Sequence, residues 1–89
     1  MAERSFEIIN EKGLHARASA KLVEVVEGHE ATATVAKDGS TVSGDSIMGL
    51  LMLAASRGTQ IEVATEGPDA DALMAALETL IANRFGEDF

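Results

Sequence analysis

Residues 13–28 read GLHARASAKLVEVVEG, and they predict a helix that opens immediately after a histidine. Between positions 16 and 27 the apolar residues recur at the i, i+4, i+7, i+8 spacing of one helical face. These residues are Ala18, Leu22, Val25 and Val26. Charged residues such as Lys21 fall on the opposite face, and Gly28 is a common C-terminal stop. His15 therefore stands at the N-terminal boundary of the helix.

Strand-like segments lie on both sides of this helix. SFEII (5–9) alternates apolar with polar residues, and QIEVATE (60–66) alternates more cleanly. Between them, ATATVA (31–36) is rich in β-branched residues, KDGS (37–40) is a turn sequence, and TVSG (41–44) follows. This order is typical of a β-hairpin. The sequence thus predicts four short strands, two of them joined as a hairpin.

Two more helical segments complete the pattern. DSIMGLLMLAA (45–55) begins with Asp45 and Ser46, either of which can serve as the N-cap. The last helix opens at Gly67 and Pro68, where two aspartates suit the positive end of its dipole. Its expected buried stripe consists of Leu73, Leu77, Leu80 and Ile81. The order β-α-β-β-α-β-α predicts a two-layer α/β (α+β) sandwich with helices on one face of the sheet.

The composition restricts the class of protein. A chain of 89 residues is expected to fold as one domain, 1–89. Its net charge of −8 disfavours nucleic acid and anionic membranes as partners. The absence of cysteine excludes disulfides and thiolate metal sites. The N-terminus lacks the apolar core of a signal peptide, and no apolar run is long enough to span a bilayer, so we expect a cytoplasmic protein.

Neither a cofactor nor a metal is expected. The sequence has no Walker loop, no dinucleotide-binding glycine pattern and no nucleophile elbow. His15 and His29 lie at opposite ends of one predicted helix and cannot share a metal ion. His29, in a polar loop, is expected to be an ordinary solvated residue.

His15 is placed where phosphate chemistry is favourable. A helix N-terminus presents unpaired backbone N–H groups and the positive end of a dipole, which together suit a phosphate group. Arg17, in the first turn, adds a cation that stays charged at any relevant pH. Both features should keep His15 neutral and nucleophilic. The alternative is that His15 only caps the helix and Arg17 is an exposed surface residue.

The helix predicted over 45–55 is apolar on every side. On a helical wheel Leu50 and Leu53 share one side, and a second cluster lies elsewhere. That cluster consists of Ile47, Met48 and Leu51. If the first pair faces the sheet, the second cluster is exposed and suits transient docking of a partner. The alternative is that the whole helix is core.

Both motifs, GLHARAS (13–19) and GDSIMGLL (44–51), resemble those of the HPr family, the histidine-containing phosphocarriers of the bacterial phosphotransferase system. The resemblance covers nearly the whole chain. It implies an open-faced β-sandwich, with a four-stranded antiparallel sheet covered on one side by three helices. It also implies that Nδ1 of His15 accepts a phosphoryl group from enzyme I and passes it to an enzyme IIA domain. Such a protein is a carrier and not an enzyme, and we expect a monomer.

The resemblance also implies roles for other residues. Arg17 corresponds to the arginine that helps hold the phosphoryl group, and Ser46 to the serine that an HPr kinase/phosphorylase modifies in many members. Serine before a helix is also a common N-cap, which needs no kinase. The partners are expected to grip an apolar surface beside the first helix. Its residues are Ala16, Ala20, Ile47, Met48 and Leu51.

This sequence departs from the family pattern at several positions. Ala18 stands where proline is usual, and Asp45 where lysine is common before the serine. Glu24 and Glu27 form an acidic rim where sugar-transporting relatives tend to have lysines. These differences favour a regulatory branch such as the nitrogen-related phosphotransferase system. A competing hypothesis is a regulatory binding module that is never phosphorylated and uses only the 47–52 patch.

Overall fold

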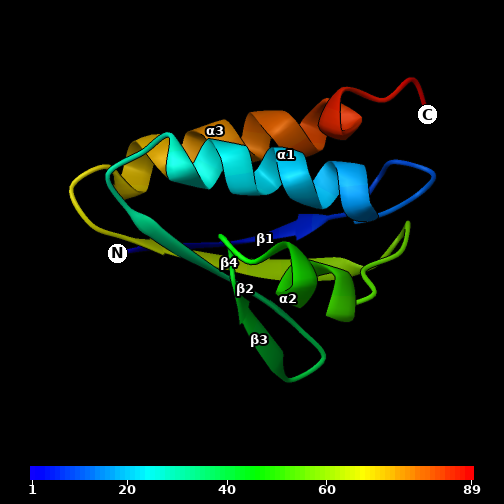
Figure 1. Ribbon diagram of the computed structural model, residues 1–89, viewed down its shortest axis with the longest axis horizontal. Helices are drawn as coiled ribbons and strands as arrows, with labels where there is room; N and C mark the ends of the chain where they lie inside the picture. Colours follow the sequence, from blue (N-terminus) through cyan, green and yellow to red (C-terminus); the bar gives the residue numbers. More distant parts are fainter.

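Four strands form one antiparallel sheet in the order β1-β4-β2-β3 (Figure 1). The computed structural model describes all residues, 1–89. The strands are β1 (Ala2–Glu7), β2 (Thr32–Lys37), β3 (Ser40–Ser43) and β4 (Gln60–Glu66). Because β4 pairs with both β1 and β2, the N-terminal strand and the hairpin strands lie on opposite sides of it.

The hairpin between β2 and β3 forms where the turn sequence predicts it. Asp38 and Gly39 occupy the turn with φ values of 51° and 85°. Two successive positive φ values match the right-handed twist of the flanking strands, and Asp-Gly is a preferred pair for such a turn. Val35 consequently lies opposite Val42 in the register.

Helices α1 (Ala16–Glu27) and α3 (Ala70–Ala82) run side by side over one face of the sheet (Figure 1). The short helix α2 (Ile47–Met52) contacts α1 and β3, and a single 3-10 turn, η1 (Arg84–Gly86), follows α3. No helix has the length and apolar character that crossing a membrane requires. The expected open-faced sandwich of four strands and three helices is confirmed.

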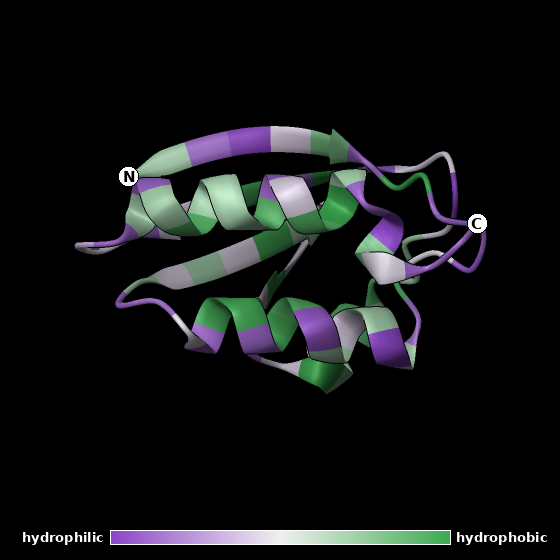
Figure 2. Cartoon of the chain, turned by 90° about the horizontal axis from the view of Figure 1, so that it is seen from above, coloured by the Kyte–Doolittle hydropathy of each residue, from purple (hydrophilic) through white to green (hydrophobic).

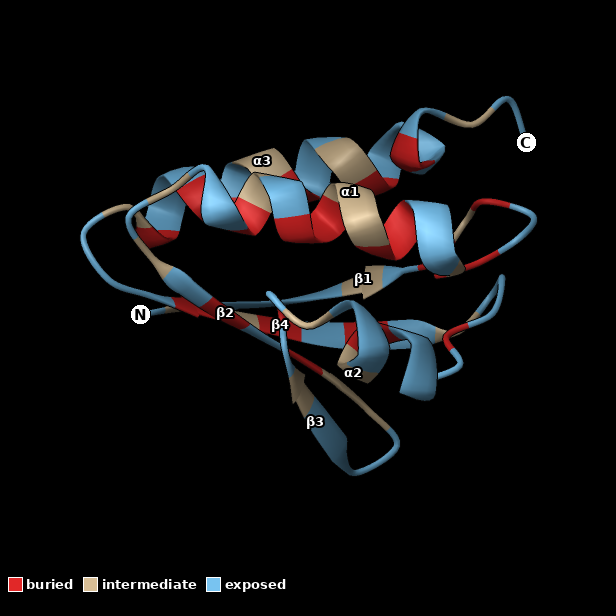
Figure 3. Cartoon of the chain, viewed as in Figure 1, coloured by how far each residue is buried: buried red, intermediate tan, exposed pale blue.

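The core lies between the helices and the sheet. Along β4, Ile61, Val63 and Thr65 are buried, whereas Gln60 and Glu62 are exposed on the open face. Figure 3 shows buried residues on the inner sides of α1 and α3, and Figure 2 shows hydrophobic and hydrophilic residues mixed along both helices. With few aromatic residues, the core is mostly aliphatic. Its fully buried large side chains include Ile8, Leu22, Leu50, Leu73, Leu77 and Phe85.

Helix α1 has the predicted bounds, and strand β4 spans the predicted residues 60–66. The first strand does not: it begins at Ala2 and ends at Glu7 instead of spanning 5–9. Ile8 is still buried, but its backbone N–H and C=O pair with Thr59 and Gly58 outside the ladder. The alternation of hydrophobic residues indicates which residues are buried. Because Ile8 is buried beyond the end of β1, the alternation predicted a strand end that is too late.

The second helix is shorter than predicted, because it ends at Met52 instead of Ala55. Leu53 and Ala54 close it with hydrogen bonds to the third residue back, and Ala54 then adopts a positive φ of 52°. Leu53 and Ala55 are nevertheless buried. These apolar residues belong to the turn after α2, and their hydrophobicity made the predicted helix too long.

Two stripe residues and the start of the last helix also differ from expectation, because α3 begins at Ala70 instead of at Gly67 and Pro68. Val25 and Leu80 are only partly buried, whereas Ser19 and Val23 join the buried face of α1. Asp69 precedes α3 without capping it by its side chain. That carboxylate instead accepts a hydrogen bond from the backbone N–H of Glu30 at 2.7 Å.

Candidate functional site

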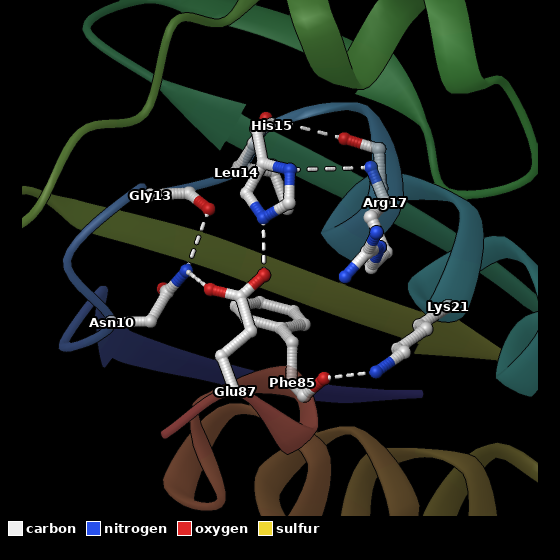
Figure 4. A network of polar contacts seen from close by, with 9 residues as sticks. Asn10, Gly13, Leu14, His15, Arg17, Lys21, Phe85 and Glu87 are labelled. Carbon is white, nitrogen blue, oxygen red and sulfur yellow. Dashed lines mark hydrogen bonds and ion pairs between the residues drawn. The ribbon is translucent and has the colours of Figure 1, made fainter. Parts of the chain in front are cut away.

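His15 is the N-cap of α1, and its ring is partly exposed (Figure 4). Its backbone is extended, and its carbonyl accepts the hydrogen bond from the Ser19 N–H at 2.8 Å that starts the helix. The Nδ1 atom accepts a hydrogen bond from the backbone N–H of Arg17 at 3.3 Å. The imidazole thereby satisfies one of the N–H groups that a helix start leaves unpaired.

The loop before His15 is fixed to the segment after α2. Gly13 has a φ of 66°, and a Cβ there would lie 2.5 Å from the carbonyl oxygen of Ala55. The N–H of Leu14 donates to that same oxygen at 2.8 Å, and the Leu14 side chain is buried. Glycine is therefore required at position 13, and the histidine is held on a well-anchored loop.

The second ring nitrogen of His15 contacts a residue that sequence reasoning missed. The carboxylate of Glu87 pairs with Nε2 of His15 through Oε2, and its Oε1 accepts a hydrogen bond from Asn10 Nδ2 at 3.0 Å (Figure 4). Asn10 is fully buried and also donates to the Gly13 carbonyl at 2.8 Å. No local pattern predicts this network, since Glu87 follows the last predicted helix and its partners lie over seventy residues away.

The pKa of Glu87 reflects these contacts. Burial by itself raises the pKa of this carboxyl, but the hydrogen bonds from Asn10 and His15 and the charges of His15 and Lys12 outweigh it. The net result is a pKa below the ordinary value of 4.5. Glu87 is therefore a carboxylate at neutral pH.

Arg17 is exposed and its guanidinium makes no ion pair. It lines a hollow of about 310 Å³ together with the cations Lys12 and Lys21. The carboxylates of Glu11, Glu87 and Asp88 line the same hollow. An unpaired guanidinium two residues after His15 is available to an anionic group bound there.

The expected division of the second helix is confirmed. Leu50 and Leu53 are buried, whereas Ile47, Met48 and Leu51 are 40%, 70% and 36% exposed. Met52 lies within the predicted 47–52 patch but outside the three-residue cluster; it is also exposed, and we call these four exposed residues the apolar patch. Leu51 and His15 line one shallow hollow, so the apolar patch adjoins the histidine. On α1, Ala16 is exposed and Ala20 partly exposed.

Ser46 is the N-cap of α2, as one of the two expected possibilities. Its Oγ accepts a hydrogen bond from the Gly49 N–H at 3.0 Å. Asp45 does not cap the helix, because its carboxylate accepts a hydrogen bond from Ser43 Oγ at 2.5 Å.

The remaining expected residues are found at the surface or in the core. Glu24 and Glu27 are exposed on α1, and Ala18 is fully buried in its first turn. His29 is partly buried, with Nδ1 at 2.7 Å from the carbonyl oxygen of Val25. No group of three metal-ligating side chains is present.

A four-stranded open-faced sandwich whose first long helix begins at a partly exposed histidine, beside an apolar patch, is the architecture of small phosphocarrier proteins. The family model described as "PTS HPr component phosphorylation site" matches residues 2–83. The chain belongs to the HPr family.

Similar proteins agree with this assignment over the whole length. The chain is 47% identical over 87 residues to the phosphocarrier protein HPr of Cupriavidus necator, covering 98% of each chain. It is 37% identical over 87 residues to the phosphocarrier protein NPr of Escherichia coli, covering 97% of each. The crystal structure of "HPr-C-His" from Thermoanaerobacter tengcongensis superimposes with a TM-score of 0.95 at 37% identity, covering 100% of both chains.

Proposed function

We propose that this protein carries a phosphoryl group on Nδ1 of His15, receives it from enzyme I and passes it to an enzyme IIA domain. The observation that carries the proposal is the position of Nδ1, which faces the backbone N–H of Arg17 at the start of α1. A nitrogen that accepts a hydrogen bond is unprotonated, so its lone pair can attack phosphorus once the Arg17 N–H is released. The chain is a substrate in this relay and catalyses no reaction of its own.

The transfer step needs only the groups in place around His15. The Nδ1 lone pair attacks phosphorus, the Nδ1–P bond forms, and the P–N bond of the donor phosphohistidine breaks, with its electron pair going to the donor imidazole. His15 keeps its proton on Nε2, so its ring becomes positively charged. The Arg17 N–H, released from Nδ1, and the Arg17 guanidinium then hold the phosphoryl oxygens at the positive end of α1.

The apolar patch is the docking surface for both enzyme I and the enzyme IIA domain. Met48 and Met52 project from α2 into solvent, and flexible thioether side chains adapt to more than one partner. The patch adjoins His15, so a protein seated on it brings its own reactive histidine close to Nδ1. Ala16 and Ala20 extend the surface along α1. The working form is a monomer with this surface uncovered.

We further propose that phosphorylation of Ser46 by an HPr kinase/phosphorylase regulates docking. A phosphate on Ser46 would place about two negative charges beside the apolar patch, next to Asp45. The label from ATP should be acid-stable and absent in Ser46→Ala, while labelling of His15 by enzyme I persists in that variant. Acid-stable label on another residue would overturn this assignment.

The acidic residues Glu24 and Glu27 on α1 support a nitrogen-type enzyme IIA as the acceptor. Like charges at a rim slow association with acidic partners. Transfer from the phosphorylated chain to purified nitrogen-type and sugar-type enzyme IIA domains tests this choice. Equal or faster transfer to the sugar-type domain would refute it.

The experiment that tests the carrier function is incubation with phosphoenolpyruvate and enzyme I, followed by intact mass measurement. One phosphoryl group should appear, should be acid-labile, and should be absent in His15→Ala. The alternative function is a binding module that is never phosphorylated, which the exposed apolar patch would also serve. No labelling of the wild-type chain, together with partner binding that His15→Ala leaves intact, would favour that alternative.

A further inference from the structure

The segment after α3 turns back toward the loop that carries His15. Arg84, Phe85 and Gly86 have φ values of 55°, 55° and 79°. Arginine and phenylalanine rarely adopt this left-handed conformation, so surrounding contacts must hold it. Phe85 is fully buried, and Lys21 Nζ donates to its carbonyl oxygen at 2.6 Å. The Glu11 N–H also donates to the Phe89 carbonyl at 3.0 Å, which ties the chain end to the loop.

This turn places the Glu87 carboxylate between Asn10 Nδ2 and Nε2 of His15 (Figure 4). Asn10 Nδ2 donates to Oε1 and to the Gly13 carbonyl, and the opposite amide orientation would set Asn10 Oδ1 against two acceptors. The orientation of Asn10 is thereby fixed, although its Oδ1 is buried without a partner. Asn10 holds one carboxylate oxygen, and the other faces Nε2 of His15.

An ionised carboxylate only accepts hydrogen bonds, so Nε2 of neutral His15 must carry the proton. We infer that Glu87 is a positioning residue that, together with the Arg17 N–H facing Nδ1, selects this tautomer and leaves the lone pair on Nδ1, the atom that accepts the phosphoryl group in the proposed function. The link from this tautomer to phosphoryl acceptance rests on the proposed function. The tautomer itself can be measured in the unphosphorylated chain. A paired carboxylate orients histidine in the same way in other nucleophilic sites.

Glu87 also faces the charge that transfer creates. When Nδ1 accepts the phosphoryl group, His15 keeps the Nε2 proton and its ring becomes a cation. Arg17 on α1 and Lys12 in the preceding loop are like charges near this ring, whereas Glu87 is the carboxylate that contacts it. Glu87 should therefore shift the exchange with the phosphorylated donor toward phospho-His15.

The first test reads the tautomer in the free protein, from the imidazole ¹⁵N chemical shifts at a pH where His15 is neutral. The wild-type chain should show Nε2–H alone. In Glu87→Gln and Glu87→Ala no carboxylate excludes an unprotonated Nε2, so a fraction of the Nδ1–H form should appear beside the Nε2–H form that the Arg17 N–H still favours. Glu62→Gln makes the same change at an exposed position on the open face of the sheet and should match wild type. An unchanged tautomer in both Glu87 variants would overturn the inference.

The second test measures the phosphorylated fraction at equilibrium with enzyme I and limiting phosphoenolpyruvate. Loss of one charge-assisted hydrogen bond in Glu87→Gln should shift the exchange constant about fivefold toward the donor. Glu62→Gln should leave the exchange constant unchanged. Glu87→Gln keeps the size of the side chain, so a purely structural role would change unfolding but neither readout. If the wild-type chain takes no phosphate at all, the proposed function fails, while the tautomer result still decides the role of Glu87.

Discussion

At His15, one side chain has a separate partner for each ring nitrogen. Nδ1 accepts from the Arg17 N–H, and Nε2 faces Glu87. Helix capping and phosphoryl acceptance are therefore compatible, because the phosphoryl group would replace the imidazole as the acceptor for the same N–H. Under the proposed function, the two interpretations left open by the sequence describe the unphosphorylated and the phosphorylated state of one residue.

The Arg17 guanidinium provides a direct prediction at this scale. Arg17→Ala should lower the rate of phosphoryl transfer from enzyme I about 10- to 100-fold, because a charged donor to the transferred group is lost. Its exposed side chain makes no ion pair, so the free energy of unfolding should stay near wild type. Quench-flow kinetics and urea unfolding check the two parts. Transfer at the wild-type rate would contradict the role assigned to Arg17.

Local sequence signals identify His15 but not Glu87. A histidine before a regular apolar repeat is visible as a helix boundary, and Arg17 lies within the same turn. Glu87 reaches the site only because Phe85 and the positive φ values of η1 turn the chain back. Contacts between residues so far apart in sequence depend on the tertiary fold, which periodicity does not report.

At the scale of elements, α2 shows which features a helical wheel predicts correctly and which it does not. The wheel separates the buried Leu50 from the exposed Met48 correctly, because side-chain direction repeats with the helical period. The wheel also extends the helix into 53–55, because Leu53 and Ala55 are buried in a turn. Hydrophobicity indicates which residues are buried but not the backbone conformation that buries them.

The apolar patch on α2 can be tested with one charge. Met48→Glu should raise the KM for phosphorylation by enzyme I about tenfold, since an ion at the centre of an apolar contact must be desolvated. Ala72→Glu on α3 adds the same charge at an exposed site away from the patch and serves as the control. Steady-state kinetics with both variants measure the two KM values for phosphorylation by enzyme I. An equal change in the two KM values would remove the patch from the docking surface.

The loop that supports His15 gives a matched pair of glycine variants. Gly13→Ala should destabilise the fold by about 2–4 kcal/mol, because its Cβ would clash with the Ala55 carbonyl and φ is positive. Gly39→Ala also has a positive φ but open space around it, so it should cost only about 1 kcal/mol. Urea unfolding of both variants measures the difference. Equal losses would mean that the contact with Ala55 is not tight.

At the scale of the whole molecule, the C-terminal segment 84–89 meets the loop before α1 at the site. The residue order along the sequence predicts the sandwich, since strand and helix patterns alternate in the order that a two-layer fold requires. Closure of the site by 84–89 is not predicted, because that segment has no periodic pattern and only three residues in η1. The two-layer architecture follows from the hydrophobic patterns of the strands and helices. The position of residues 84–89 over the site depends on individual side-chain contacts.

Closure by Glu87 predicts a pH dependence of stability. Since folding lowers the pKa of Glu87, its contribution is present above the ordinary value of 4.5 and is lost as pH falls through the lower folded pKa. The free energy of unfolding of wild type should exceed that of Glu87→Gln at pH 7, and the gap should narrow below about pH 4.5. Urea unfolding at a series of pH values provides the measurement. A gap that widens as the pH falls would contradict the assigned sign.

The central claim is that Nδ1 of His15 carries the phosphoryl group. The most direct measurement is the ³¹P–¹⁵N coupling pattern of the ¹⁵N-labelled chain after phosphorylation by enzyme I and phosphoenolpyruvate. We predict a single phosphohistidine, bonded through Nδ1 of His15, with the proton kept on Nε2. Phosphate bonded to Nε2, or found on any residue other than His15, would contradict this account.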